Sequence, residues 1–310
     1  MALPAHGLKL FLSLSLAAQV VSAAPQLAFS FDDGPRLAET PLLTPSQRNE
    51  ALLAALREAK IKAALFVTVG NGADRPAGRA LLEAWGREGH AIANHTVSHP
   101  DFGKRETTLE AFRAELLGCD EAIRSVTGYR KWFRFPYLRE GSPDAKRVAF
   151  KKFLVEQGYR NGHVTLDTSD WRLDQVLRER LEKDPKTDLD IFRKAYLGHL
   201  KQRAEAYRSL SRRLFDRDVA QVVLLHHNLI NALFLKDAIA LFRAEGWEFV
   251  DPETAYADPV YALEPAEQAA GQSLLVALAR SRFGRNLPEL IELFDDGDAA
   301  IAALTESRAQ

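Results

Sequence analysis

The chain of 310 residues contains a single cysteine, Cys119, and its charges nearly cancel, with 41 lysines and arginines against 42 aspartates and glutamates. One cysteine excludes an internal disulfide, a cysteine-based zinc site and an iron–sulfur cluster. A net charge of −1 provides no overall field that would attract nucleic acid or anionic lipid, so we expect neither as a partner. The hydrophobic fraction of 46% is typical of a soluble globular protein and excludes a disordered chain or a multi-span membrane protein.

Residues 1–24 have the pattern of a secretory signal peptide. A weakly basic start leads into an apolar run from Leu10 to Val21, and small residues follow around Ala23 and Ala24. A retained membrane anchor is the alternative, but about 12 apolar residues are too few to span roughly 30 Å of hydrocarbon. We therefore expect cleavage near Ala23 or Ala24, an exported protein that is periplasmic or secreted, and no stable membrane insertion afterwards.

Apolar segments alternate with amphipathic segments over most of the remaining chain. The apolar segments predict about seven strands: Leu27–Asp32, Ala63–Val69, Ala91–Asn94, Lys131–Phe135, Tyr159–Leu166, Ala220–Leu225 and Trp247–Val250. Between them, helix starts are predicted by the capping sequences Thr44–Gln47, Thr107–Glu110 and Ser142-Pro143. Strands that alternate with helices indicate an α/β fold with a parallel sheet, either a (β/α) barrel or a doubly wound sheet.

Two regions fall outside this alternation. Residues 172–218 are charged and helical, and we expect them to form an insertion in a barrel of residues 25–258. Residues 259–310 are rich in leucine and predict a small helical C-terminal extension. The charge of the insertion, which includes Arg178, is typical of a solvated helix face, and a specific anion-binding role is the alternative.

Chemically capable side chains gather where the predicted strands end. In chain order these are Asp32, Asp33, His95, His99, Arg134, Asp170, Trp171 and His226. In a parallel (β/α) barrel, the carboxyl ends of all strands lie on one face, and active sites are built there. The sequence therefore predicts a functional site at this face.

The acidic pair and the histidine pair together indicate a metal site. Asp32-Asp33 alone is compatible with an Asx turn. A lone histidine is usually structural, and we expect this of His90, which stands at the start of a strand. However, two adjacent carboxylates need a cation or an arginine to remain ionised. His95 and His99 are four residues apart, a spacing that suits two ligands of a borderline divalent metal.

Five segments, in order, resemble the motifs of the polysaccharide deacetylases of carbohydrate esterase family 4, the NodB-homology domain. They are Ser30–Pro35, His95–Pro100, Arg134–Tyr137, Asp167–Trp171 and Val222–His226. The family fold is a distorted (β/α) barrel, and the resemblance implies that fold for about residues 25–257 of this chain.

The resemblance also implies a metal and the residues that hold it. Asp33, His95 and His99 would bind one divalent metal, with zinc as the first choice and Co2+, Ni2+ or Mn2+ as alternatives. Asp32 would be the general base that takes a proton from metal-bound water.

The remaining roles follow from the same resemblance. His226 would protonate the leaving amine, Arg134 would orient Asp32, and Asp170 would orient His226 and keep it protonated. The substrate would contact four further residues: Pro136, Tyr137, Trp171 and Leu224. The backbone N–H of Tyr137 would stabilise the oxyanion, and Trp171 and Leu224 would enclose the acetyl methyl group.

The implied function is metal-dependent hydrolysis of acetyl groups, mainly N-acetyl, from a glycan such as chitin oligomers, peptidoglycan or an exopolysaccharide. The alternatives are a non-catalytic barrel that binds glycan, and a metal-dependent hydrolase that acts on another ester. Two points stay open. His227 stands where the family usually has an acidic residue, although the register with Leu224 favours His226 as the acid. The insertion forms either a wall over the groove or an outer brace.

Overall fold

The computed structural model describes residues 24–266, 271–284, 293 and 296–306. Residues 1–23, which make up nearly all of the predicted signal peptide, lie outside the described residues. Within the described residues, no helix combines the length and the apolar character that crossing a membrane requires.

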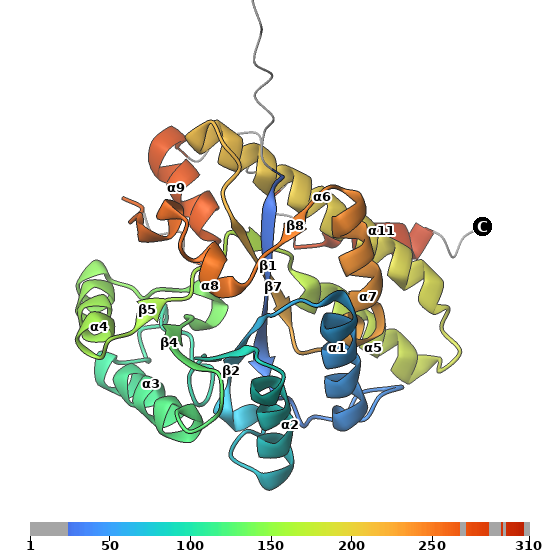
Figure 1. The fold of residues 1–310 in the computed structure, drawn as a ribbon, viewed down its shortest axis with the longest axis horizontal. Coiled ribbons are helices and arrows are strands. Elements are labelled where there is room, and N and C mark those ends of the chain that lie inside the picture. Colours follow the sequence, from blue (N-terminus) through green and yellow to red (C-terminus); the bar gives the residue numbers. More distant parts are fainter. Residues whose placement is uncertain (1–23, 267–270, 285–292, 294–295, 307–310) are drawn as a thin grey trace, which may run out of the picture.

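A curled sheet of parallel strands forms the centre of the molecule, and helices cover its outside (Figure 1). The strands are β1 (Gln26–Gly34), β2 (Ala64–Val67), β3 (Ala91–Asn94), β4 (Tyr129–Phe133), β5 (Arg160–Asn161), β6 (Leu166–Asp167), β7 (Gln221–His226) and β8 (Glu248–Phe249). Seven of them follow the order β5-β4-β3-β2-β1-β7-β6, and β8 pairs with the start of β1. Among the described strands, the outermost two, β5 and β6, do not pair with each other, so the barrel is open on one side. The predicted distorted (β/α) barrel is confirmed.

The sequence predicts one strand over residues 159–166, but the structure has two short strands there, β5 and β6. β5 pairs with β4, and β6 pairs with β7, so this segment crosses the opening of the barrel. The chain turns at Gly162, whose N–H donates to the carbonyl of Phe133. A side chain at Gly162 would meet the ring of Phe66 at 2.6 Å, so only glycine allows this close crossing.

The helices are α1 (Pro45–Ala59), α2 (Pro76–Arg87), α3 (Leu109–Ile123), α4 (Asp144–Glu156), α5 (Asp170–Lys183), α6 (Leu189–Phe215), α7 (Leu229–Ala244), α8 (Pro252–Ala255), α9 (Leu274–Phe283) and α11 (Asp298–Glu306). The predicted capping box of Thr44 and Gln47 is present at the start of α1. The other two capping predictions are wrong in detail. Thr108 caps α3 in place of Thr107, and Pro143 precedes α4 without a side-chain cap.

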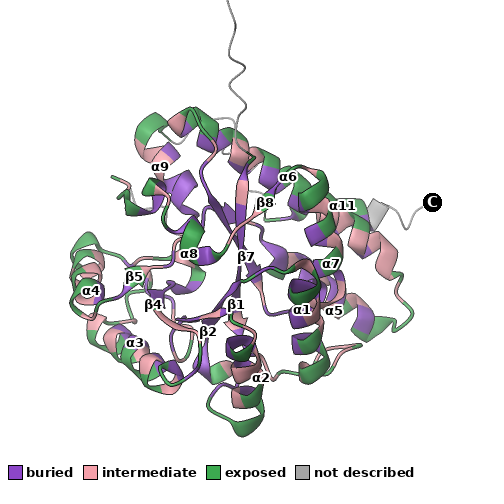
Figure 2. Cartoon of the chain, in the orientation of Figure 1, coloured by how far each residue is buried: buried purple, intermediate pink, exposed green. Residues whose placement is uncertain are grey.

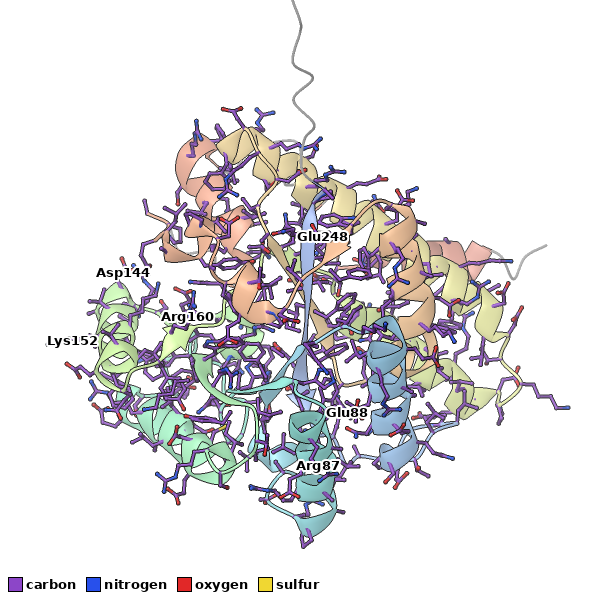
Figure 3. All side chains as sticks on the ribbon, viewed as in Figure 1. Arg87, Glu88, Asp144, Lys152, Arg160 and Glu248 are labelled. Atoms are coloured by element: carbon purple, nitrogen blue, oxygen red, sulfur yellow. The ribbon has the colours of Figure 1, made fainter. Side chains whose placement is uncertain are left out.

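Apolar side chains fill the space between the sheet and the helices. Figure 2 shows buried residues along the strands and exposed residues on the outer faces of the helices. A second cluster, rich in phenylalanine, joins α3 and α4 to β4, and Phe112 stacks on Phe102 in it with a centroid distance of 4.0 Å. Charged side chains such as Arg87, Asp144 and Lys152 project outward from the helices (Figure 3).

Most of the expected insertion, 172–218, forms α5 and the long helix α6, and α6 packs against α7. The described part of the C-terminal extension contains α9 and α11, which both pack on α6. The two regions therefore contact each other on one side of the sheet.

Two helical glycines provide a test of the packing. Gly86→Ala places a Cβ 2.2 Å from the carbonyl oxygen of Thr127 and should lower the free energy of unfolding by about 1–3 kcal/mol. Gly198→Ala, on the exposed side of α6, meets nothing within 4 Å and should raise it by about 1 kcal/mol. Urea unfolding followed by circular dichroism measures both values. An unchanged or raised free energy of unfolding in the Gly86 variant would contradict the packing of α2.

Candidate active site and metal centre

A cavity of about 430 Å³ opens at the carboxyl ends of the strands. It is lined by eight of the residues that the sequence predicts for the site: Asp32, Asp33, His95, His99, Tyr137, Trp171, Leu224 and His226. The sheet brings them together because parallel pairing aligns the strand ends, as where Asp32 pairs with His226 across β1 and β7.

Asp33, His95 and His99 form a compact group of potential metal ligands. One ligand atom from each lies within 4.8 Å of the others. Nδ1 of His95 donates to the carbonyl oxygen of Arg134 at 2.8 Å, so Nε2 carries the free lone pair. The hydroxyl of Thr68 donates to Oδ1 of Asp33 at 3.1 Å and fixes that carboxylate.

The charge state of the group suits a divalent metal. Burial acts to raise the pKa of Asp33, but His99, His226 and His95 outweigh it and lower the pKa to about 2. Burial lowers the pKa of His99 to about 4, with a further contribution from His95. At neutral pH the group therefore offers an ionised carboxylate and a neutral imidazole, which are the forms that bind metal. The residues fit one metal ion.

Asp32 is held by the buried guanidinium of Arg134. Nη1 of Arg134 donates to Oδ1 of Asp32 at 2.6 Å, and its Nε donates to the carbonyl of Gly162 at 2.8 Å. The two side chains are only 1% and 4% exposed. The second oxygen, Oδ2, lies 3.4 Å from Nε2 of His95, so it faces the potential metal ligands.

His226 is held in the same way by the fully buried Asp170. Oδ1 of Asp170 accepts a hydrogen bond from Nδ1 of His226 at 2.6 Å, and its Oδ2 accepts from the side-chain amides of Asn228 and Asn231. Burial acts to lower the pKa of His226, but Asp170 outweighs it and raises the pKa to about 10. His226 is therefore a cation at neutral pH, with its Nε2 proton left to donate.

His227 has a different environment from its neighbour. It is fully buried, its Nε2 lies 3.0 Å from Oδ1 of Asn49, and it does not line the cavity. Burial, with the nearby charge of Arg48, lowers its pKa to about 3. His90 is also buried and accepts a hydrogen bond from the N–H of Ala63.

The substrate-facing residues are divided between the rim and the interior. Tyr137 and Trp171 are 53% and 45% exposed at the rim, whereas Leu224 is nearly buried in the wall. Pro136 is buried and does not line the cavity, so its role as a substrate contact stays a prediction. Its ring begins the short turn that carries Tyr137 to the surface.

The site concentrates backbone strain. Positive φ angles, which are uncommon outside glycine, occur at Asp33, Thr96, His99, Tyr137 and Ser169. Four of these five residues line the cavity. Strain of this kind persists where surrounding contacts determine the conformation, and it is typical of functional sites.

Sequence reasoning missed a second group of cavity residues. The remaining lining residues are Arg36, Leu138, Arg139, Asp167, Ser169, Asp174, Gln175, Arg178, Asn228, Gly271 and Asp296. Three of them lie on α5, so the insertion forms part of the wall and α6 supports it from outside. Asp174 and Arg178 are four residues apart, a spacing that places both side chains on one face of a helix, and this was the one feature of the sequence that could have indicated the pair. Nothing local to Gly271 or Asp296 indicated that the C-terminal extension reaches the cavity.

Comparison with known proteins agrees with this geometry. Residues 20–155 match the family model described as polysaccharide deacetylase. The chain is 28% identical over 148 residues to a peptidoglycan-N-acetylglucosamine deacetylase from Bacillus cereus, a match that covers 47% of this chain and 46% of that protein. It is 36% identical over 107 residues to a chitooligosaccharide deacetylase from Sinorhizobium fredii, with 33% and 44% covered. The chain thus spans about half the length of the curated relatives that it matches.

The fold is shared with solved structures at lower identity. The structure of a polysaccharide deacetylase from Bacillus cereus superimposes with a TM-score of 0.52 at 20% identity and covers 73% of this chain and 91% of its own. Some proteins with this fold are pseudoenzymes, so the fold alone does not establish turnover. The family model includes the potential ligands and Arg134, whereas Asp170 and His226 lie beyond it.

The ligand group predicts that the chain binds one divalent metal ion. Asp33→Ala should abolish stoichiometric binding of zinc, because it removes the charged ligand of the group. Asp296→Ala is the matched control, since it removes an exposed carboxylate from the same cavity outside the ligand group. Metal content after dialysis measures both. Equal zinc retention in the Asp33 variant and the wild type would contradict the assignment.

Proposed function

We propose that this chain is a polysaccharide deacetylase, which hydrolyses acetyl groups, mainly N-acetyl, from an acetylated glycan. The observation that carries the proposal is one cavity that contains a metal-ligand group, a carboxylate held by a buried arginine and an imidazolium held by a buried carboxylate. An amide needs an activated water molecule and an acid for the departing amine, and these groups supply both.

Asp33, His95 and His99 would hold the metal, for which zinc is our first choice because carboxylate and imidazole donors suit it. When bound, the metal lowers the pKa of a water molecule toward neutrality and polarises the acetyl carbonyl group. No nucleophilic serine or cysteine is needed for this chemistry.

Asp32 acts as the general base. Its Oδ1 is occupied by Nη1 of Arg134, so Oδ2, which faces His95, accepts the proton of the attacking water. The same ion pair fixes the direction of the Asp32 carboxylate.

His226 acts as the general acid. Its Nδ1 is bonded to Asp170, so Nε2 delivers the proton to the departing nitrogen. His227, buried beside Asn49, does not reach the cavity and has no such role. The backbone N–H of Tyr137 stabilises the developing oxyanion, and Trp171 and Leu224 enclose the acetyl methyl group.

The curated relatives act on peptidoglycan and on chitooligosaccharides, and these are the substrate classes that we propose first. We also propose that the protein is exported, on the basis of residues 1–24. Cell fractionation and the N-terminal sequence of the mature protein test that expectation.

Acetate release from chitooligosaccharides and from peptidoglycan, with added zinc, tests the function. Asp32→Asn should lower kcat by about 10²–10⁴-fold, the usual contribution of a general base, while zinc is still bound. Asp74→Asn, an exposed aspartate outside the cavity, is the control. Undiminished release in the Asp32 variant would reject the base assignment. Zinc binding and glycan binding without acetate release from any substrate would support the non-catalytic barrel.

The pH profile tests the acid. Asp170→Asn removes the charge that raises the pKa of His226, so that pKa falls and less imidazolium remains at alkaline pH. The alkaline limb of kcat/KM should move to lower pH by roughly 1–3 units, the usual effect of one neighbouring charge.

His226→Gln should remove the alkaline limb of the kcat/KM profile. The zinc content and the circular dichroism spectrum of this variant should match those of the wild type. An alkaline limb that stays in place in the Asp170 variant would contradict the role of the pair.

A further inference from the structure

One wall of the cavity carries positive charge that the proposed reaction does not use. Arg36 follows β1, Arg178 lies on α5, and both line the cavity. Arg48, on α1, is fully buried beneath them and donates to the carbonyl oxygens of Arg36 and Ala38. The backbone of Arg36 is therefore held in place while its side chain faces the cavity. We call Arg36 and Arg178 the arginine wall.

The carboxylate of Asp174, which lies beside the arginine wall, has hydrogen-bond partners at both of its oxygens. Oδ2 of Asp174 accepts a hydrogen bond from Nε of Arg178 at 2.8 Å, and its Oδ1 accepts from the N–H groups of Leu229 and Ile230 at the start of α7. The terminal nitrogens of Arg178 take no part in the bond to Asp174.

The guanidinium of Arg36 has no hydrogen-bond or ion-pair partner among the described residues. Glu39, on the same loop, is exposed and does not line the cavity. Burial lowers the pKa of Arg48 to about 10, and the charge of Arg36 adds to this effect, whereas Asp174 and Glu39 oppose it.

Two other carboxylates of the cavity, those of Asp167 and Asp296, form no ion pair with the arginine wall among the described residues. Oδ1 of Asp167 accepts a hydrogen bond from the N–H of Ser169, and Oδ1 of Asp296 accepts one from the Ser169 hydroxyl at 2.9 Å. Burial raises the pKa of Asp167. Arg139, the third arginine of the cavity, is paired with Asp101. Arg36 thus lines the cavity without an ion-pair partner among the described residues, and Arg178, which is paired with Asp174 through Nε, keeps its terminal nitrogens outside that bond.

We infer that the arginine wall binds a carboxylate of the glycan, so that the substrate is an acidic glycan and the carboxylate lies close to the acetylated sugar. A guanidinium matches a carboxylate through two parallel hydrogen bonds, and it remains charged at every physiological pH. Two sugar chemistries present such a group: a uronic acid, at C6, and a lactyl ether, as on muramic acid. This inference rests on the proposed deacetylation and names its substrate class.

A second interpretation assigns Arg36 to the metal site. Arg36 is among the groups that lower the pKa of Asp33, so it helps to keep that ligand ionised. In that case its removal would weaken zinc binding and would reduce turnover of neutral and acidic glycans alike. The two interpretations differ in the ratio of the two activities.

The experiment compares kcat/KM for acetate release from three tetrasaccharides: neutral chitotetraose, chitotetraose oxidised to carboxylates at C6, and a peptidoglycan tetrasaccharide that contains muramic acid. The zinc-loaded wild type should favour at least one acidic substrate over chitotetraose by about tenfold or more, the effect of one charge-assisted pair. Arg36→Gln and Arg178→Gln should each reduce this ratio severalfold, and the double variant should abolish it. The ratio should also fall with added salt.

Arg172→Gln is the matched control, because Arg172 lies on α5 outside the cavity lining. A wild-type ratio of one or less would overturn the inference. An equal loss on all substrates, with weaker zinc binding, would assign Arg36 to the metal site and overturn it as well.

The failure of the proposed function has a separate signature, which is no acetate release from any of the three substrates. In that case, calorimetric binding of the acidic and neutral tetrasaccharides to the zinc-loaded Asp32→Asn variant still tests the arginine wall. Tighter binding of an acidic tetrasaccharide, lost in the Arg36 and Arg178 variants, would support the wall, and equal binding would reject it.

Discussion

The ion pair of Arg134 and Asp32 is the interaction on which the site depends. A buried guanidinium is tolerated only when its donors and its charge are satisfied. Arg134 meets this requirement by bonding to Ser30, Asp32, Gly162 and Tyr256, residues that come from β1, the segment that crosses the open side of the barrel, and the segment after α8. Its carbonyl oxygen also accepts the hydrogen bond of His95. One residue therefore fixes the direction of a carboxylate, the tautomer of a metal ligand and the point where the barrel opens.

The cavity holds two reactive side chains, Asp32 and His226, each in its own buried environment. On one side, the carboxylate of Asp32 is bonded to the buried guanidinium of Arg134. On the other side, the buried carboxylate of Asp170 raises the pKa of His226 and keeps that imidazole protonated. Each of the two central groups is held by a partner that is itself buried, so its direction within the cavity is fixed. The arginine wall adds a third electrostatic region to the same cavity.

Much of the fold and eight of the nineteen residues that line the cavity could be predicted from the sequence. The strand ends were recognisable because apolar runs stop at Asp32, Asn94 and Leu225, and parallel pairing then places the following residues on one face. The break of the fifth predicted strand could not be predicted, because it depends on Gly162 approaching Phe66 from a distant part of the chain. The sequence also could not show that Pro136 is buried outside the cavity lining, because a motif identifies neighbours in the chain without saying which of them faces the cavity.

The sequence by itself determined the types of reactive group and the order in which the strands present them, because hydrophobic alternation and the spacing of His95 and His99 are local properties. It also favoured His226 over His227, since alternate residues of a strand face opposite sides. Only the tertiary structure decided which further residues complete the cavity. Arg36, Arg178 and Asp296 come from a loop, an insertion and the C-terminal extension, and they meet through the packing of α5, α6 and α11. Packing between distant segments depends on shape and burial across the whole molecule, which no local pattern of residues records.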